Sequence, residues 1–335
     1  MTNNGAGHGN IAVFVPHEGC PHRCSFCDQR AISGAVRVPS PDEVQELCRR
    51  AIAENQGRTL ELAFFGGSFT AIDRALMERL LAAAQPFLGC GISGIRISTR
   101  PDAIDAERLA LLRSAGVTAI ELGAQSTDDA VLQKNGRGHT AQDIHDACAL
   151  IRRVGFELGL QMMLGLPGAG ARSDLASAAE LAALGPDTVR IYPALVLKNT
   201  EMAQWFFNGT YRPLTLDEGV ARAARVMELF EDSDIRIIRV GLHPTGELEK
   251  NLLAGPYHPA FRELCEGERM LEKLQKQLSL AHPAAGELRV AVHPREVSRM
   301  IGQNRRNAQR LSELGWRLKV IPDPGAAPLD PQLIG

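Results

Sequence analysis

Short apolar runs alternate along the chain with longer segments whose apolar residues have helical spacing. The runs are continuous and rich in β-branched residues, which is typical of strands buried on both faces of a parallel sheet. They lie at 11–15, 60–65, 95–98, 117–122, 157–163 and 189–192. Between them, helix caps such as Ser40 and Thr140 predict helices over about 41–55 and 140–154. This alternation predicts an α/β fold in which βα units with right-handed crossovers form a partial barrel.

The C-terminal third predicts a second, smaller unit. One more strand is predicted at 235–240 and a long polar helix over about 260–279, and the most plausible linker is 283–286. Residues 288–323 then have the pattern strand, helix, turn, helix, strand. We therefore predict a core with its extension over 1–282 and a small α/β module over 287–323.

Three cysteines follow the first predicted strand closely, in the motif Cys20-x-x-x-Cys24-x-x-Cys27. They are too close together for an ordinary disulfide framework and indicate a metal centre. A structural zinc site needs four ligands, and no second cysteine pair follows. A [4Fe–4S] cluster held by three thiolates keeps one iron open for another ligand. Two alternatives are a zinc site completed by His17 or His22, and three thiols without a ligand.

Composition and charge narrow the class of protein. The chain has 335 residues, 44 % of them hydrophobic, and a net charge of −2, so no overall basic field indicates nucleic-acid binding. Residues 287–319 are locally basic. No apolar run approaches the roughly 20 residues of a membrane span, and residues 1–10 do not resemble a signal peptide. A cytoplasmic protein with reduced thiols is the expectation.

The cysteine motif resembles that of the radical S-adenosylmethionine (radical SAM) enzymes. The motifs that follow it in the chain are, in order, STRPD (98–102), ELGAQS (121–126), RGHT (137–140), MMLGLPG (162–168) and IYPALVLKNT (191–200). Together they resemble the radical SAM half of the Elongator catalytic subunit, which modifies wobble uridines of tRNA. The anaerobic coproporphyrinogen oxidase group shares the general layout. The resemblance covers about residues 10–265, and the acetyltransferase domain of the Elongator subunit has no counterpart in the 335 residues.

The resemblance implies a partial (β/α)6 radical SAM barrel and a set of cofactor contacts. The three cysteines would bind the cluster, the open iron would bind SAM, and Phe26 would shield the cluster. The expected SAM contacts are Gly66 and Gly67 at its methionine end, Ser98 and Arg100 at its carboxylate, Glu121, Gln125 and Ser126 at its ribose, and Met162 and Met163 at its adenine. Two of these assignments have alternatives, because Arg100 could form a structural ion pair and the methionines could be core residues.

Two further groups of residues are candidates for substrate contact. His139 and Tyr192 could face the substrate or be structural. The turn at 301–305 between two predicted helices resembles the loop of a KH-type RNA-binding module, with Arg in place of its last glycine. Its RNA contacts would come from Gly302, Arg305, Arg306 and Arg310. The alternative is a small α/β cap with a solvated basic face.

These residues predict a radical SAM enzyme that reductively cleaves SAM to a 5′-deoxyadenosyl radical and acts on an RNA nucleotide, in tRNA. An electron donor such as flavodoxin or ferredoxin is implied. One alternative is a radical SAM enzyme that acts on a small biosynthetic intermediate. The other is a non-catalytic RNA-binding protein with a structural cluster.

Overall fold

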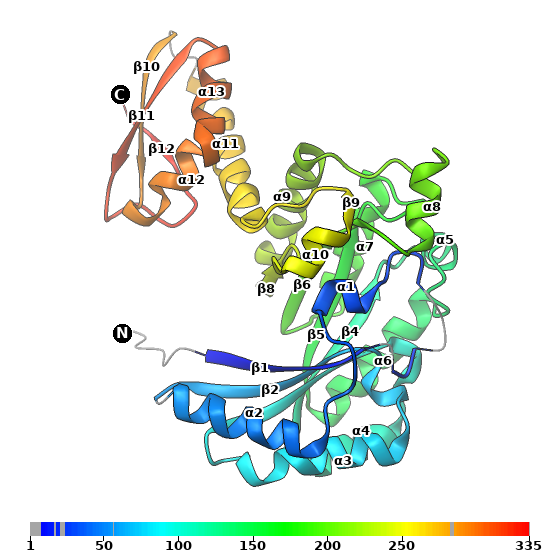
Figure 1. Ribbon diagram of the computed structural model, residues 1–335. Helices are drawn as coiled ribbons and strands as arrows, with labels where there is room; N and C mark the ends of the chain where they lie inside the picture. Colours follow the sequence, from blue (N-terminus) through cyan, green and yellow to red (C-terminus); the bar gives the residue numbers. More distant parts are fainter. Residues whose placement is uncertain (1–7, 17, 21–23, 56, 282–284, 335) are drawn as a thin grey trace.

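A curled sheet of seven parallel strands is the centre of the computed structural model, which describes residues 8–16, 18–20, 24–55, 57–281 and 285–334 (Figure 1). Its strand order is β1-β2-β3-β4-β5-β6-β8. The predicted partial α/β barrel is therefore confirmed, with the strand expected at 235–240 as its seventh. The strands are β1 His8–Val15, β2 Thr59–Gly66, β3 Ile92–Thr99, β4 Val117–Gln125, β5 Glu157–Leu164, β6 Thr188–Pro193 and β8 Arg236–Val240.

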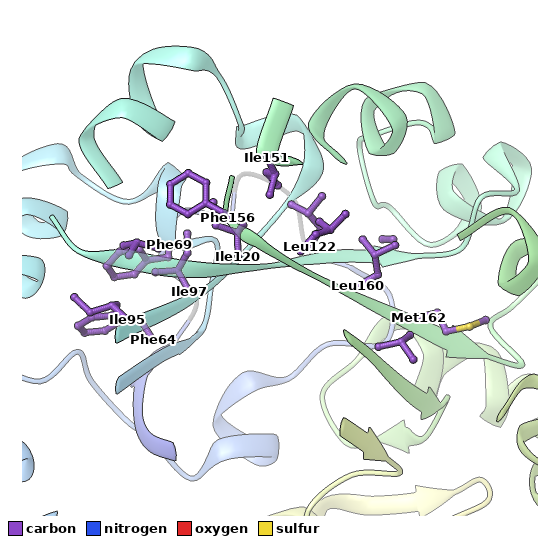
Figure 2. Close-up of a cluster of buried hydrophobic side chains, with 14 of the residues drawn as sticks. Phe64, Phe69, Ile95, Ile97, Ile120, Leu122, Ile151, Phe156, Leu160 and Met162 are labelled. Carbon is purple, nitrogen blue, oxygen red and sulfur yellow. The ribbon is translucent and has the colours of Figure 1, made fainter. Parts of the chain in front are cut away.

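Helices cover the outer face of this sheet and enclose the main hydrophobic core. Figure 2 shows part of that core, where Ile120 and Leu122 of β4 pack with Leu160 and Met162 of β5. Because successive strand residues point to opposite faces, the residues between them point to the inner face of the half-barrel. The covering helices are α2 Pro41–Glu54, α3 Arg74–Ala84, α4 Ala106–Ser114, α6 Ala141–Val154, α7 Ala171–Ala183 and α9 Leu216–Asp232.

The carboxyl ends of the parallel strands all lie at one edge of the sheet, where α/β barrels carry their functional residues. Short elements follow several of these ends, and β7 pairs with β9 in an antiparallel ribbon. They are α1 Gln29–Ser33, α5 Asp129–Lys134, β7 Val196–Leu197, α8 Glu201–Phe207, α10 Gly246–Asn251 and β9 Leu252–Ala254. Single 3₁₀ turns lie at Phe69–Ala71, Gln85–Phe87, Pro101–Ala103, Pro294–Glu296 and Gln303–Arg305.

The C-terminal unit contains the predicted strand, helix, turn, helix and strand, followed by a third strand. Its sheet has the order β11-β10-β12. The elements are α11 Phe261–Ala281, β10 Gly286–Val292, α12 Val297–Ile301, α13 Arg306–Glu313, β11 Trp316–Pro322 and β12 Gln332–Leu333. Residues 283 and 284 of the predicted linker lie outside the described residues.

The core of this unit includes one side of α11. Met270, Leu271, Leu274 and Leu278 pack against Leu288 and other residues of the small sheet. In Figure 1, α11 also runs alongside α13 on one side of that sheet. The packed unit therefore includes more of the chain than the predicted module of residues 287–323, because it begins within α11. Within the described part of the chain, no helix is long and apolar enough to cross a membrane.

Candidate metal centre

The cysteine loop connects β1 to α1 at the carboxyl edge of the sheet. Cys20, Cys24 and Cys27 are free, partly buried thiols, whereas His17 and His22 lie outside the described residues. Burial, followed by the neighbouring Cys24, raises the pKa of Cys20 and raises that of Cys27 to about 12. The thiols are therefore close enough to influence one another. Among the described residues, no three His, Cys, Asp or Glu side chains form a group that could hold a metal ion.

A buried arginine of the RGHT motif lies directly against this loop. Arg137 is 6 % exposed, and its Nη1 donates a hydrogen bond to Cys24 Sγ at 3.2 Å. Its Nη2 donates to the carbonyl of Gly123 at the inner face of β4, and its buried Nε has no partner among the residues that the structure describes. Its charge lowers the pKa of both Cys20 and Cys27, against the larger effect of burial. Arg137 therefore favours the thiolate form that metal binding requires.

Arg100 brings a second guanidinium to the same region. It pairs with Asp102 through two hydrogen bonds of 2.9 Å, from Nε to Oδ1 and from Nη2 to Oδ2. Its Nη1 is buried and has no partner among the described residues. The charge of Arg100 also lowers the pKa of Cys20. Arg100 thus forms the ion pair of the alternative interpretation, and it also retains one donor, which an anion beside the cysteine loop could use.

A buried hydrogen-bond network, called the clasp below, fixes the cysteine loop to the end of α5 and to α8. Ser25 Oγ donates to Asn135 Oδ1 at 2.7 Å, and Ser25 N donates to the carbonyl of Asn135 at 3.1 Å. Asn135 Nδ2 in turn donates to the carbonyls of Val131 and Pro167 at 2.8 and 2.9 Å. The backbone N–H of Met202 on α8 donates to the carbonyl of Ser25. Ser25 lies between Cys24 and Cys27, so the clasp sets the position of both thiols.

Asn135→Ala should destabilise the fold and weaken metal retention. The substitution leaves the Ser25 hydroxyl and the Pro167 carbonyl without these partners in a buried place, whereas the Val131 carbonyl keeps the backbone N–H of residue 135. Each such group costs about 1–3 kcal/mol. We expect a loss of roughly 3 kcal/mol in urea unfolding and less iron per chain after anaerobic reconstitution. Among the described residues, the exposed side chain of Asn208 bonds only to Thr210 in its own turn, so Asn208→Ala should change neither value. Full stability and full iron content in Asn135→Ala would contradict a positioning role.

Apolar side chains enclose the cysteine loop from one side. Phe26 is 9 % exposed and belongs to a cluster that includes Leu166 and Met202, and Cys24 and Cys27 pack against it. Met163 on the inner face of β5 joins this cluster. Met162 instead points to the outer face and is fully buried in the main core (Figure 2). The structure therefore places Met163, and not Met162, against the same apolar cluster as Cys24 and Cys27.

The Gly66-Gly67 turn packs against the backbone of the cysteine loop. A Cβ added at Gly67 would lie 1.9 Å from the carbonyl oxygen of Glu18. The N–H groups of Gly67 and Ser68 donate to the carbonyls of Val15 and Glu18 at 2.7 and 2.9 Å. Glycine is therefore required for the loop to approach β2. Ser98 lies on β3, half-buried, opposite Glu121 of β4.

Charged side chains form a network across the inner face of the half-barrel. Both carboxylate oxygens of Glu121 accept hydrogen bonds from Arg190, at 2.7 and 2.9 Å, and one lies 3.5 Å from Arg96 Nη1. Arg96 also pairs with Glu61 on β2 and Glu157 on β5, at 2.6 and 3.0 Å. Glu121, predicted at the SAM ribose, is thus already paired with two arginines at 3 % exposure.

The other residues of the ELGAQS motif point in different directions. Gln125 has a φ of 68° and accepts a hydrogen bond from Gln161 across the inner face, at 3.4 Å. Ser126 Oγ lies 3.1 Å from Ser177 Oγ on α7 and accepts a hydrogen bond from the N–H of Asp128. The structure therefore places Gln125 near the inner face and Ser126 against the helical layer.

His139 and Tyr192 are both close to arginines. His139 is 4 % exposed, its Nε2 lies 3.2 Å from the carbonyl oxygen of Ala124, and its Nδ1 has no partner among the described residues. Burial, and then the charge of Arg137, lower the pKa of His139 to about 4. The imidazole is therefore neutral near pH 7, and Nε2 carries the proton that bonds Ala124. Tyr192 lies beside Arg190 at the end of β6, and burial raises its pKa.

The neutral state of His139 should make stability depend on pH. Its folded pKa of about 4 lies below the unfolded value near 6.5. The contribution of His139 to stability is thus complete above pH 6.5 and is lost as the pH falls towards 4. Between pH 7 and 5.5 we expect wild-type stability to fall by roughly 1 kcal/mol more than that of His139→Gln, measured by urea unfolding. The half-buried His145, whose Nε2 lies 2.7 Å from Glu180 Oε1, serves as the comparison, and His145→Gln should not flatten the wild-type slope. Equal slopes in all three proteins would contradict the buried neutral state.

The turn that resembles a KH loop is packed against the rest of the chain. Arg306 pairs with Asp217 on α9 at 2.8 Å, and Arg310 with Glu268 on α11 at 2.5 Å. A Cβ added at Gly302, where φ is 78°, would lie 2.8 Å from the N–H nitrogen of Asn307. Arg305 is exposed. Of the three predicted RNA-contacting arginines, two already have carboxylate partners.

Comparison with known proteins shows two family matches. The sequence model of the Radical SAM superfamily matches residues 14–182, about half of the chain. That of the Radical_SAM C-terminal domain matches residues 186–273. The first match includes the cysteine loop and the strands from β2 to β5.

Individual proteins agree with these matches. The tRNA uridine(34) acetyltransferase of Dehalococcoides mccartyi is 26 % identical over 239 residues, covering 61 % of this chain and 52 % of that protein. The chain spans about half the length of the curated relatives that it matches first. Two solved structures share the fold. Elp3 of Methanocaldococcus infernus has 20 % identity, a TM-score of 0.63 and coverage of 83 % and 64 % of the two chains. Coproporphyrinogen III oxidase of Escherichia coli has 18 % identity and a TM-score of 0.51, and the match covers 68 % of this chain and 53 % of that chain.

Proposed function

The chain belongs to the radical SAM superfamily, and from this premise we propose that it is an enzyme that cleaves SAM reductively and modifies a nucleotide of tRNA. Members of the superfamily use a [4Fe–4S] cluster and SAM. The observation that carries the proposal is the cysteine loop, where three free thiols lie beside the guanidinium of Arg137. Three thiolates suit a cluster that keeps one iron open.

The surrounding residues fit both cofactors. Cys20, Cys24 and Cys27 would hold the cluster, and Arg137 would balance part of its negative charge. Nη1 of Arg100, which has no partner in the described part of the chain, would donate to the carboxylate of SAM. When bound, the two cofactors supply a one-electron cleavage of the sulfonium that gives a 5′-deoxyadenosyl radical. Phe26 and Met163 would exclude water beside the cysteines. Flavodoxin or ferredoxin would donate the electron.

The proposed tRNA substrate rests on the curated relatives that are named tRNA uridine(34) acetyltransferases. Gln161, Arg190 and Tyr192 lie on the inner face of the half-barrel, and Tyr192 is next to the carboxyl end of β6, where a nucleotide would meet the cofactors. In the C-terminal unit, the exposed Arg305 remains a candidate for RNA contact, whereas Arg306 and Arg310 would first have to leave their carboxylate partners.

Comparing tRNA nucleosides by mass spectrometry, in cells with and without the gene, tests the substrate. The proposal predicts that one modified nucleoside disappears without the gene and returns with the wild-type gene, but not with a Cys24→Ala gene. An unchanged set of nucleosides would contradict the tRNA substrate. It would favour the second candidate, a radical SAM enzyme that acts on a small molecule, which the pairing of Arg306 and Arg310 also favours.

A further inference from the structure

Arg239 is a half-buried arginine at the carboxyl end of β8. Its Nε donates to the carbonyl of Gly241 at 3.2 Å. Among the residues that the structure describes, no Asp or Glu pairs with it. Other arginines nearby are compensated, because Arg190 pairs with Glu121 and Arg262 with Glu266. Arg239 thus has a charge for which the described part of the chain supplies no counterion.

Neighbouring arginines add to the uncompensated positive charge around Arg239. Arg190 of β6 is its register partner in the sheet. Burial, and then the charges of Arg190 and Arg262, lower the pKa of Arg239, while Tyr192 acts in the opposite direction. A partly desolvated charge without a counterion destabilises a fold. An anion bound from outside would remove that penalty.

The position of Arg239 is also suited to a ligand at the candidate metal centre. It is the penultimate residue of β8, so it lies at the same edge of the sheet as the cysteine loop, which follows β1. Phe14 and Phe65 lie half-buried on the same inner face, with ring centroids 6.3 Å apart. The guanidinium of Arg190 lies 5.1 Å from the centre of the Phe65 ring. A nucleotide suits this arrangement, since its base can stack on the rings beside Arg190 while its phosphate pairs with Arg239, the register partner of Arg190.

We propose that Arg239 binds a phosphate group of the RNA strand at the mouth of the half-barrel. A guanidinium can donate two parallel hydrogen bonds to phosphate oxygens, and Nη1 and Nη2 of Arg239 make no contact with a described protein acceptor. This inference rests on the proposed RNA substrate and names one contact that selects it. The phosphate would also compensate the charge that Arg190 and Arg262 disfavour.

The test compares RNA binding by full-length, reconstituted wild type, Arg239→Gln and Arg239→Lys. A fluorescently labelled synthetic tRNA anticodon stem-loop is titrated across a range of salt concentrations. Loss of one phosphate contact should lower the slope of log K against log salt by about 0.7 for a single-stranded segment. We expect affinity about tenfold weaker at low salt for Arg239→Gln. Arg239→Lys should retain the slope, because it keeps the charge.

Two comparisons separate this contact from a structural role. Arg236 is on the same strand, 69 % exposed, and pairs with Glu157, so Arg236→Gln should bind RNA like the wild type. Removing an uncompensated charge should leave thermal stability unchanged or higher, so Arg239→Gln should not unfold more easily. If Arg239→Gln kept the wild-type affinity and salt slope, the inference about Arg239 would be overturned, while the proposed tRNA substrate would not. The same holds if Arg236→Gln bound RNA as weakly as Arg239→Gln. A wild-type protein without RNA binding would overturn both the inference and the proposed tRNA substrate.

Discussion

Cys24→Ala should lower the iron bound per chain after anaerobic reconstitution by at least about tenfold, because even changes to groups that only support metal ligands reduce affinity that much. Cys24 is the thiol that Arg137 contacts, and its neighbourhood includes the other two cysteines. The absorbance of an iron–sulfur cluster in the visible range should be lost together with the iron. Iron analysis and absorbance of the same preparation measure both.

Cys90 offers a matched control for this substitution, since its thiol is free and exposed. Cys90→Ala should retain wild-type iron and absorbance. If Cys24→Ala retained as much iron as Cys90→Ala, the cysteine loop would not be the metal centre, and the assignment of Cys20 and Cys27 would lose its basis.

Glu121→Gln should lower the free energy of unfolding by about 3–5 kcal/mol, the usual effect of removing one partner from a buried ion pair. Burial lowers the pKa of Arg190, but the charge and hydrogen bonds of Glu121, together with those of Tyr192, outweigh this effect and the pKa is raised. The variant leaves Arg190 with a neutral amide in place of its carboxylate. Urea unfolding at neutral pH measures the difference.

An exposed ion pair provides the comparison for Glu121. Glu46 pairs with Arg49 at 2.7 Å on the surface of α2, where solvent screens the charges. Glu46→Gln should therefore have a stability close to wild type. A loss of similar size in both variants, or none in Glu121→Gln, would contradict the view that the inner-face network stabilises the half-barrel.

The fold could be predicted from the sequence because each strand is encoded by a short apolar run of its own. Each strand is marked by its own β-branched residues, as at 11–15 and 117–122, and the parallel sheet follows from their alternation with helices. The N-terminal boundary of the C-terminal unit could not be predicted in the same way. Leu274 and Leu278 belong to a helix, α11, that the sequence assigns to the core unit because it precedes the predicted linker. Their packing against the small sheet depends on tertiary contacts that the sequence pattern does not reveal.

The candidate site was predictable where chemistry lies in one short motif, and less so where it depends on contacts between distant residues. The cysteine spacing identifies the loop, but Arg137 reaches Cys24 across 113 positions, and Arg190 reaches Glu121 across 69. The RGHT motif drew attention to His139, since imidazole titrates near neutral pH, although its arginine makes the contact with the thiol.

Side-chain direction explains a further difference. Met162 and Met163 are adjacent in sequence, and the alternation of a strand sends them to opposite faces. A motif alone does not give the phase of that alternation, whereas the sheet register does. In the same way, the basic turn at 302–305 has the residues of a nucleic-acid contact, but Asp217 and Glu268 from other helices pair with the arginines that follow it.

Formation of 5′-deoxyadenosine tests the central claim most directly. The reconstituted wild-type protein is incubated anaerobically with SAM, a chemical reductant and bulk tRNA, and the products are separated by chromatography. The proposed function predicts 5′-deoxyadenosine in amounts that depend on SAM and reductant and that are lost in Cys24→Ala but not in Cys90→Ala. A wild-type protein that carries its full iron and forms no 5′-deoxyadenosine would contradict the account.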